Sequence, residues 1–312
     1  MSTSKIVLVT GATAGIGRIT ALHLARQGHR VIASGRKAAE LMTLKGEASG
    51  LKLDTLMLDV TSAPSIAAAV TEVDRLTDGH GIDVLVNNAG FGILGPTSEI
   101  SDSEMRRQYD TNVFGLMNVT RAFLPKMRDR RSGRVINVSS VGGLITLPFF
   151  GVYNSTKYAV ESLSDALRYE LRAFNIDVVL VEPGVIRTNF EATAVSNLDQ
   201  FAGSPYKHAM QKYEEMSKMA DRFASNPIVI AKAIARATNA RRPWARYVAP
   251  RSTNFIVWFG ALAPTRVWDW AMRAVGHLSK KSLGITGPAP AAQASAAPAA
   301  RDSAPTLRIA NG

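Results

Sequence analysis

Thr10-Gly-Ala-Thr-Ala-Gly-Ile-Gly17 is the stretch that decides the fold, because it stands at the end of a strand-length apolar run, Lys5–Thr10. Its three glycines, Gly11, Gly15 and Gly17, precede and open a helix-length segment. Glycines in such a turn let the backbone approach a pyrophosphate, whose charge is met by the N-terminus of the following helix. Such a turn can also be a plain strand-to-helix connection. Its place after the first strand favours nucleotide binding.

Strand-length apolar runs and helix-length amphipathic segments alternate along most of the chain. The strand-like runs are Lys5–Thr10, Arg30–Ser34, Leu51–Leu58, Ile82–Asn87, Arg134–Ser139, Ile176–Val181 and Arg246–Ala249. The helical segments include Gly15–Gln27, Ser65–Leu76, Ser103–Arg128 and Tyr153–Phe174. This alternation predicts an α/β fold with a parallel, doubly wound sheet and helices on both faces. The central strands are continuous Val/Ile/Leu runs, as strands covered on both faces require.

The end of the second strand discriminates between cofactors. An acidic residue there would bind a ribose 2′-hydroxyl, but the sequence is Ala33-Ser34-Gly35-Arg36-Lys37. The Arg36 guanidinium can hold a 2′-phosphate through charge-assisted hydrogen bonds, and no carboxylate opposes it. A solvated Arg-Lys pair on a loop is the alternative interpretation. The sequence therefore favours NADP over NAD.

Polar residues also follow the third and fourth strands. Asn87-Asn88-Ala89-Gly90 closes the fourth strand, where its amides would bind the adenosine side of a cofactor or brace the strand. Asp59 follows the third strand and could accept a hydrogen bond from an adenine amino group. Because Asn and Asp also favour turns, each position suits a turn residue equally well.

Tyr153 and Lys157 stand four residues apart, so they share one face of a helix. An ammonium beside a phenol favours the phenolate, so we expect Lys157 to lower the pKa of Tyr153 below its usual value of about 10. A Ser139-Ser140 pair lies 13 to 14 residues upstream of the tyrosine. On its own, such a spacing is compatible with a surface pair. The combination with the glycine-rich turn indicates proton transfer beside a bound nucleotide.

With these motifs in place, the sequence resembles the short-chain dehydrogenase/reductase family from residue 5 to about 250. The glycine turn, the Asn-Asn-Ala-Gly, the Ser-Ser, the Tyr-x-x-x-Lys and Pro183-Gly184 stand in the family's order. The resemblance implies a Rossmann-type, seven-stranded parallel sheet. It also implies a homo-oligomer, because the helices from Ser103 and Tyr153 pair between subunits in this family and carry apolar residues beyond one face.

The resemblance assigns four catalytic residues. Ser140, rather than Ser139, would orient the substrate, and Tyr153 would give or take the proton. Lys157 would lower the tyrosine pKa and bind the nicotinamide ribose, while Asn112 would hold a water that links Lys157 to solvent. The residues expected to contact the cofactor are Gly11, Ala14, Gly15, Ile16, Gly17, Arg36, Asp59, Val60, Asn88, Ala89, Gly90, Tyr153, Lys157, Pro183, Gly184, Val185 and Thr188.

The substrate is expected to be hydrophobic. The stretch 140–149 looks like that of family members acting on bulky apolar ketones and alcohols, such as steroid and retinol enzymes. Leu147, Phe149 and Phe190 are candidate pocket walls beside Ser140 and Tyr153, although each also suits plain core. We therefore predict an NADP(H)-dependent oxidoreductase that interconverts a steroid-, retinoid- or lipid-like ketone or aldehyde and its alcohol.

Other functions remain open at this point. A non-catalytic NADP-binding sensor or scaffold usually has a broken Ser-Tyr-Lys set, which is intact here. A carbonyl reductase of broad small-molecule specificity would share every motif. Epimerase and dehydratase relatives usually have another phosphate-turn spacing and an acidic partner near the tyrosine, and neither feature is seen.

The sequence divides into a catalytic domain, residues 1–250, and two further segments. An insertion at about 184–226 within the domain is a candidate substrate lid. Residues 251–286 form a basic, aromatic extension whose apolar runs are too short to span a bilayer. Peripheral membrane contact through this extension is one hypothesis, and closure of a pocket or packing on a subunit is the other. The Pro/Ala-rich stretch 287–312 is expected to be disordered.

Composition narrows the class of protein. The 312 residues contain no cysteine, so disulfides, thiolate metal sites and cysteine nucleophiles are excluded, and no metal site is predicted. The net charge of +12 suggests attraction to an anionic partner surface, such as a membrane or nucleic acid, or it simply reflects solvated charges on loops. No aromatic-basic module for nucleic acid accompanies these charges. The start of the chain does not look like a signal peptide, so a cytoplasmic setting is expected.

Overall fold

The computed structural model describes residues 4–188, 190, 194, 198–220, 224–280 and 282–284. Its centre is a seven-stranded, all-parallel sheet in the order β3-β2-β1-β4-β5-β6-β7. The strands are β1 (Ile6–Val9), β2 (Arg30–Gly35), β3 (Leu53–Met57), β4 (Val84–Asn87), β5 (Gly133–Val138), β6 (Ile176–Pro183) and β7 (Arg246–Ala249). All seven predicted strands and the doubly wound fold are therefore confirmed.

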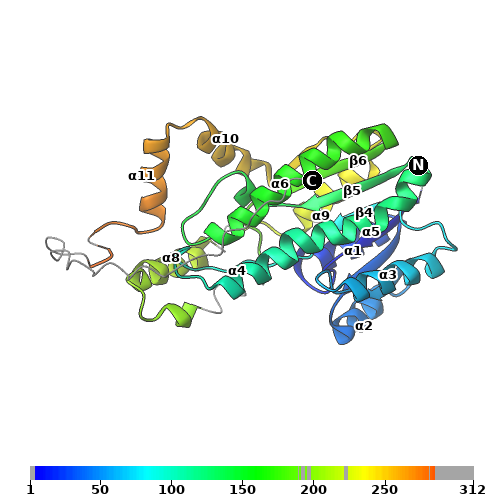
Figure 1. Ribbon diagram of the computed structural model, residues 1–312, viewed down its shortest axis with the longest axis horizontal. Helices are drawn as coiled ribbons and strands as arrows, with labels where there is room; N and C mark the ends of the chain where they lie inside the picture. Colours follow the sequence, from blue (N-terminus) through cyan, green and yellow to red (C-terminus); the bar gives the residue numbers. More distant parts are fainter. Residues whose placement is uncertain are drawn as a thin grey trace, which may run out of the picture.

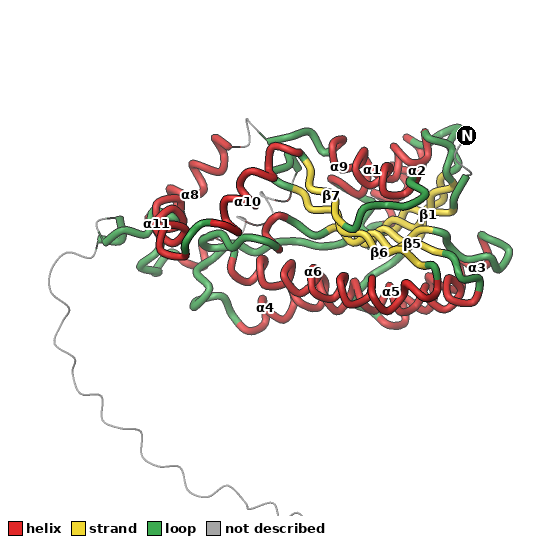
Figure 2. The backbone as a smooth tube through the Cα atoms, turned by 90° about the horizontal axis from the view of Figure 1, so that it is seen from above, coloured by secondary structure: helices red, strands yellow, loops and turns green. Residues whose placement is uncertain are grey.

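Helices cover both faces of the sheet (Figure 2). One face carries α1 (Gly15–Arg26), α2 (Ala38–Glu47) and α9 (Ile228–Asn239). The opposite face carries α3 (Ala63–Leu76), α5 (Leu116–Asp129) and α6 (Gly151–Leu171). The sequence predicted one helix over Ser103–Arg128, but the structure has α4 (Asp102–Tyr109), a π-helical turn over Asp110–Gly115, and then α5. π-Helical turns inside helices often occur at functional sites.

The core consists of two apolar layers, one on each side of the sheet. On the first side, strand residues such as Val7 and Val31 pack against Leu24 of α1 and Ile234 of α9. On the second side, Leu8 and Leu85 pack against α3, α5 and α6. Because successive side chains of a strand point to opposite faces, neighbouring residues Val7 and Leu8 enter different layers. This double burial is the reason that the central strands consist mainly of Val, Ile and Leu, and their few polar residues, such as Asn137 and Glu182, are buried as well.

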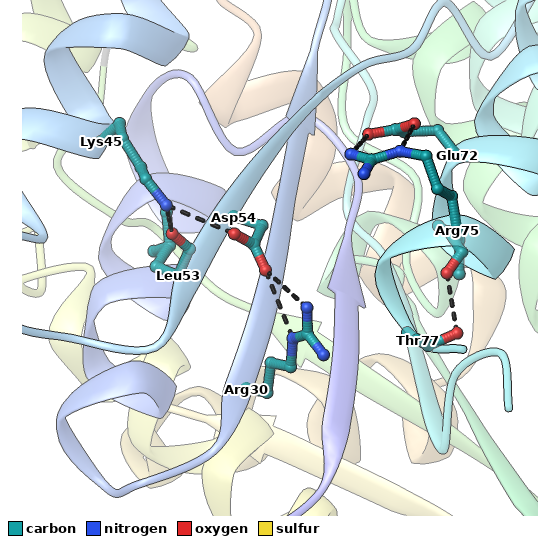
Figure 3. A network of polar contacts seen from close by, with 8 residues as sticks. Arg30, Lys45, Leu53, Asp54, Glu72, Arg75 and Thr77 are labelled. Carbon is teal, nitrogen blue, oxygen red and sulfur yellow. Dashed lines mark hydrogen bonds and ion pairs between the residues drawn. The ribbon is translucent and has the colours of Figure 1, made fainter. Parts of the chain in front are cut away.

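The outer edge of the sheet at β3 is polar. Asp54 on β3 forms ion pairs with Arg30 of β2 at 3.3 Å and with Lys45 of α2 at 3.4 Å, and Glu72 pairs with Arg75 on α3 at 2.7 Å (Figure 3). These side chains are partly exposed, so each pair adds little stability. Charges on an edge strand oppose pairing with a second sheet.

Additional helices lie beyond the carboxyl edge of the strands (Figures 1 and 2). The described part of the insertion contains α8 (Lys207–Ala220), and the C-terminal extension contains α10 (Asn254–Leu262) and α11 (Thr265–Val275). Within the described ranges, no helix is both long enough and apolar enough to cross a membrane. The segment predicted to be disordered, 287–312, lies outside the described residues.

Candidate active site

The glycine turn is closely packed against the end of β4. A side-chain carbon at Gly11 would come within 2.9 Å of Ala89 Cα, and one at Gly17 would overlap the Gly11 carbonyl oxygen and Asn88 Nδ2. Asn88 Nδ2 donates to the carbonyl oxygens of Thr10 at 3.0 Å and Gly11 at 3.2 Å. The Asn88 amide therefore braces the glycine turn, and its contact with a cofactor stays a prediction.

The start of α1 fits a phosphate-containing cofactor. Its N-cap, Ala14, has no side chain that could bond the free amides of the first turn, and no acidic residue lies in that turn. Gly11 and Gly15 both have positive φ angles, +64° and +52°, so the turn bends without side chains that would fill the approach. Uncapped amides and the positive end of the helix dipole together favour an anion. The N-terminus of α1 therefore suits a pyrophosphate.

Two predicted adenosine-side residues stand at the ends of neighbouring strands. Arg36 directly follows β2 and is exposed, and Asp59 follows β3. Burial opposes ionisation of Asp59, but hydrogen bonds from Thr61 at 2.9 and 2.7 Å and the charge of Arg36 leave the pKa of the Asp59 carboxyl below its usual value. Val60, also expected at the cofactor, is buried against Gly115 of the π-helical turn.

Ser140 and Tyr153 meet at the carboxyl ends of β5 and the start of α6. Ser140 Oγ accepts a hydrogen bond from the Gly142 amide at 3.0 Å, and its hydroxyl interacts with the Tyr153 phenol. Ser139 is buried, and its hydroxyl lies toward the Glu161 carboxyl instead, without a hydrogen bond of normal geometry. This arrangement favours Ser140 over its neighbour as the residue that would hold a carbonyl oxygen together with the phenol.

The expected lowering of the Tyr153 pKa is wrong for this structure. Burial raises the pKa of Tyr153 to about 12, and the interaction with Ser140 only partly opposes this. Lys157 Nζ lies 5.8 Å from the centre of the tyrosine ring and donates to the Val138 carbonyl at 2.9 Å. The ammonium is therefore engaged by the backbone, and desolvation of the phenolate decides the direction. At neutral pH the phenol holds its proton.

Lys157 and Asn112 are brought together across the helices. Burial lowers the pKa of Lys157 to about 8, while Glu161 opposes the shift. The Asn112 amide, in the π-helical turn, donates to the Phe91 carbonyl at 2.9 Å and to Thr156 at 3.1 Å, and it accepts from the Phe91 amide at 3.1 Å. A side-chain carbon on Gly90 would lie 3.1 Å from Asn112 Oδ1 and 3.9 Å from Lys157 Nζ. The water-holding role of Asn112 stays a prediction.

Aromatic rings surround the phenol. Phe190, a predicted pocket wall, packs on Tyr153 with ring centroids 5.2 Å apart, and Phe150, which the sequence interpretation missed, lies at 6.0 Å. Phe149 instead packs on the insertion after β6, where its ring lies 6.2 Å from that of Tyr206 and 6.0 Å from that of Tyr213, between centroids. Phe149 has a φ of +64°, so the backbone direction reverses here. Phe150, rather than Phe149, is therefore the ring beside the phenol.

The remaining predicted residues lie on two loops. Leu147 is half-buried, and its amide donates to Asn154 Oδ1 at 3.1 Å. Pro183 ends β6, and Gly184 is so close to Thr253 of the C-terminal extension that a side chain would clash. Val185 is exposed, and Thr188 lies 3.7 Å from the position of a side-chain carbon on Gly15. The loop after β6 therefore reaches back to the glycine turn.

A buried acidic cluster behind Lys157 was not anticipated. Arg246 of β7 contacts Asp165 at 2.7 Å, Glu161 at 3.3 Å and Glu182 at 3.2 Å. Glu182 is fully buried, and among the described residues neither of its oxygens accepts a hydrogen bond. Burial and the neighbouring Glu161 raise the pKa of Glu182 to about 8. In the sequence, the only signal was that Glu161 follows Lys157 by one helical turn.

Glu182 should make stability depend on pH. Between pH 4.5 and about 8 the folded protein keeps a proton on Glu182 that the unfolded chain has released, so the free energy of unfolding falls as the pH rises through this range. Glu182→Gln removes this dependence. We expect its melting temperature at pH 8 to exceed that of the wild type by about 2–4 °C, or about 1 kcal/mol. Calorimetry at pH 5 and pH 8 measures the effect.

Glu170→Gln, at an exposed position of α6, is the control. An equal rise of its melting temperature at pH 8 would contradict the assignment of the pH dependence to Glu182.

The fold and these residues can be compared with known proteins. A family model described as short chain dehydrogenase matches residues 5–199. The chain is 35% identical over 241 residues to a 3-ketodihydrosphingosine reductase of Bacteroides thetaiotaomicron, covering 77% of this chain and 85% of that protein. It is 33% identical over 261 residues to an NADPH-dependent 3-dehydrocapnine reductase of Ornithobacterium rhinotracheale, covering 80% and 90%. The structure of a short-chain dehydrogenase from Streptomyces avermitilis matches with a TM-score of 0.69 at 29% identity, covering 92% and 100%.

The chain therefore belongs to the short-chain dehydrogenase family. It is an oxidoreductase of the class that acts on CH–OH groups with a nicotinamide cofactor. The resemblance inferred from the motifs is confirmed at this level.

Proposed function

We propose that the protein is an NADP(H)-dependent oxidoreductase that interconverts a hydrophobic ketone or aldehyde and its alcohol. The observation that carries this proposal is the convergence of Ser140 and Tyr153 next to Lys157, within a wall of aromatic rings. The Ser140 hydroxyl and the Tyr153 phenol lie together beside apolar rings, where both could donate hydrogen bonds to one carbonyl oxygen of a substrate. The bound cofactor would supply or accept a hydride at the carbonyl carbon.

The residues of the chain would bind the carbonyl oxygen and transfer the proton to it. In the direction of reduction, Ser140 donates a hydrogen bond to the carbonyl oxygen, and Tyr153 gives its proton to the same oxygen as negative charge develops there. A pKa of about 12 means that the phenol is protonated throughout the neutral range, which supports reduction. The Lys157 ammonium, close behind, favours the phenolate that forms. Gly11, Gly15 and the N-terminus of α1 would hold the pyrophosphate, and Arg36 the 2′-phosphate.

A hydrophobic substrate is supported by the lining and by the relatives. Phe150 and Phe190 flank the phenol, with ring centroids 6.0 and 5.2 Å from that of Tyr153. Two relatives are named as reductases of 3-ketodihydrosphingosine and 3-dehydrocapnine. A panel of ketones tests the proposal through the absorbance of NADPH. We expect long-chain or polycyclic ketones to be reduced with a higher kcat/KM than small polar ones, and the opposite ranking would overturn the substrate class.

Arg36→Ala should weaken the preference for NADPH. The charge-assisted bonds to a 2′-phosphate would be lost while contacts to the remainder of the cofactor stay, so KM for NADPH rises by about tenfold or more and KM for NADH changes little. Initial rates with both cofactors measure this ratio. Arg26→Ala, an exposed arginine in the last turn of α1, is the control. An unchanged NADPH preference in the Arg36 variant would count against NADP as the cofactor.

We also propose that the protein is a homo-oligomer. Large apolar side chains are exposed on or next to the helices of one sheet face, including Phe114, Tyr158, Tyr169 and Phe174. Pairing of the α5 and α6 surfaces between two copies would cover them. Light scattering of the purified chain tests this, and a monomer at all concentrations would contradict it.

A further inference from the structure

The helices α10 and α11 present an apolar surface to solvent. We call Phe255, Trp258, Leu262, Val267 and Trp270 the outer face. Phe255, Trp258 and Leu262 are 77%, 70% and 78% exposed and follow one side of α10, and Trp270 of α11 is 69% exposed. Neither helix has a single buried residue. Soluble proteins rarely leave so many large apolar side chains exposed together, so this surface needs a partner.

The other side of the two helices is anchored next to the candidate active site. A side-chain carbon on Gly260 would lie 2.9 Å from Ile145, and one on Gly276 would lie 2.8 Å from Pro148. Phe259 and Trp268 tie the two helices together, with ring centroids 6.0 Å apart. Ile145 and Pro148 belong to the loop that joins Ser140 to Phe150. The extension therefore packs on the loop from Ser140 to Phe150 with one side and exposes the outer face with the other.

Positive charge flanks the outer face. Arg251, Arg266 and Arg273 are exposed around it, and Asp269 is the only acidic residue between positions 251 and 280. Among the described residues, none of these arginines is held in an ion pair. Short helices with tryptophan, phenylalanine and leucine on one side and arginine beside them lie in the interface of a bilayer, and anionic headgroups attract the arginines.

A second copy of the chain fits this surface less well. In a two-fold pairing the same patch meets itself, so the arginines of both copies would be brought together around an apolar centre. An anionic bilayer offers the opposite charge at its surface and an apolar layer immediately below. The chemistry of the patch therefore favours lipid over protein.

We propose that the outer face docks the protein onto an anionic lipid bilayer, with the aromatic side chains at the level of the headgroups and acyl boundary. The docking does not depend on the proposed oxidoreductase activity. Only the idea that docking brings a membrane-dissolved substrate to the site rests on that activity. The loop from Ser140 to Phe150 lies directly beneath these two helices. Docking would then place the loop that carries Ser140 close to the bilayer in which a hydrophobic ketone dissolves.

Vesicle flotation with the full-length chain tests the docking. Vesicles of phosphatidylcholine with phosphatidylglycerol should carry the wild type upward, and vesicles of phosphatidylcholine alone should carry much less, because the arginines lose their counter-charge. The double substitution Trp258→Ser and Leu262→Ser should weaken binding to the anionic vesicles by at least about tenfold. Trp244→Ser is the matched control, because Trp244 is 73% exposed but precedes β7 at the other end of the strand, and its binding should stay at the wild-type level.

Three results would overturn the docking. The wild type could stay off both kinds of vesicle, or the double variant could float as well as the wild type. The double variant could also form a smaller oligomer in light scattering while its flotation is unchanged, which would assign the outer face to a second copy. Reduction of a water-soluble ketone without vesicles is measured in parallel. Activity there with no flotation rejects only the docking, whereas flotation without any hydride transfer rejects only the proposed function.

Discussion

Tyr153→Phe lowers kcat for ketone reduction by about 100- to 10,000-fold, the range that a positioned proton donor contributes. The substitution removes one oxygen and keeps the ring, so the contacts with Phe150 and Phe190 remain. Burial raises the pKa of Tyr153 to about 12, so this oxygen carries a proton at neutral pH. No other described acid is placed beside Ser140 to replace it. The absorbance of NADPH, followed in stopped-flow or steady-state experiments, measures this fall in kcat.

Tyr158→Phe is the matched control, because Tyr158 lies on the same helix and is 43% exposed. It should keep the wild-type kcat. Binding of NADPH, followed by fluorescence, should be nearly unchanged in both variants, since the phenol oxygen acts on the substrate. Full turnover by the Tyr153 variant would remove the phenol from the mechanism and revive a non-catalytic, cofactor-binding role.

Much of the fold followed from local sequence patterns. The central strands were visible as apolar runs because a parallel sheet covered on both faces favours Val, Ile and Leu on both sides of each strand. Gly11 and Gly17 marked the first turn because no side chain fits there. The break between α4 and α5 was not predicted. The change from α-helical to π-helical hydrogen bonding at Asp110–Gly115 leaves the amphipathic pattern nearly intact, so periodicity does not reveal it.

The sequence indicated which residues lie near one another at the candidate site, but it did not indicate their electrostatics. The spacing of Tyr153 and Lys157 correctly placed them on one helix, but it could not show that the Val138 carbonyl engages the ammonium. Burial, which raises the tyrosine pKa, depends on rings from distant segments such as Phe190. The acidic cluster was missed for the same reason, because Glu161, Glu182 and Arg246 come from three separate elements that meet only in the folded chain. Residues that meet only through the topology carry no local signal.

Gly17→Ala should have the second large effect, through cofactor binding. The added methyl group would overlap the Gly11 carbonyl oxygen and Asn88 Nδ2, and it would come within 2.9 Å of the Gly11 carbonyl carbon. Two of these atoms are backbone and the third is fixed by bonds to Thr10 and Gly11, so the turn itself must shift. Overpacking of this kind costs about 1–3 kcal/mol. We expect the Kd for NADPH to rise by at least about tenfold and the melting temperature to fall.

Gly46→Ala separates this steric effect from the general effect of replacing glycine. Gly46 lies in α2, is exposed, and has nothing within 4 Å of the position of its missing side chain. Alanine is the better helix former by about 1 kcal/mol, so this control should be slightly stabilised and should bind NADPH like the wild type. If Gly17→Ala kept the wild-type Kd by titration calorimetry, the contact between Gly17, Gly11 and Asn88 would not set the shape of the phosphate site. Because Asn88 is held by two carbonyl oxygens, the turn should yield to a methyl group only by moving the backbone amides proposed to bind the pyrophosphate.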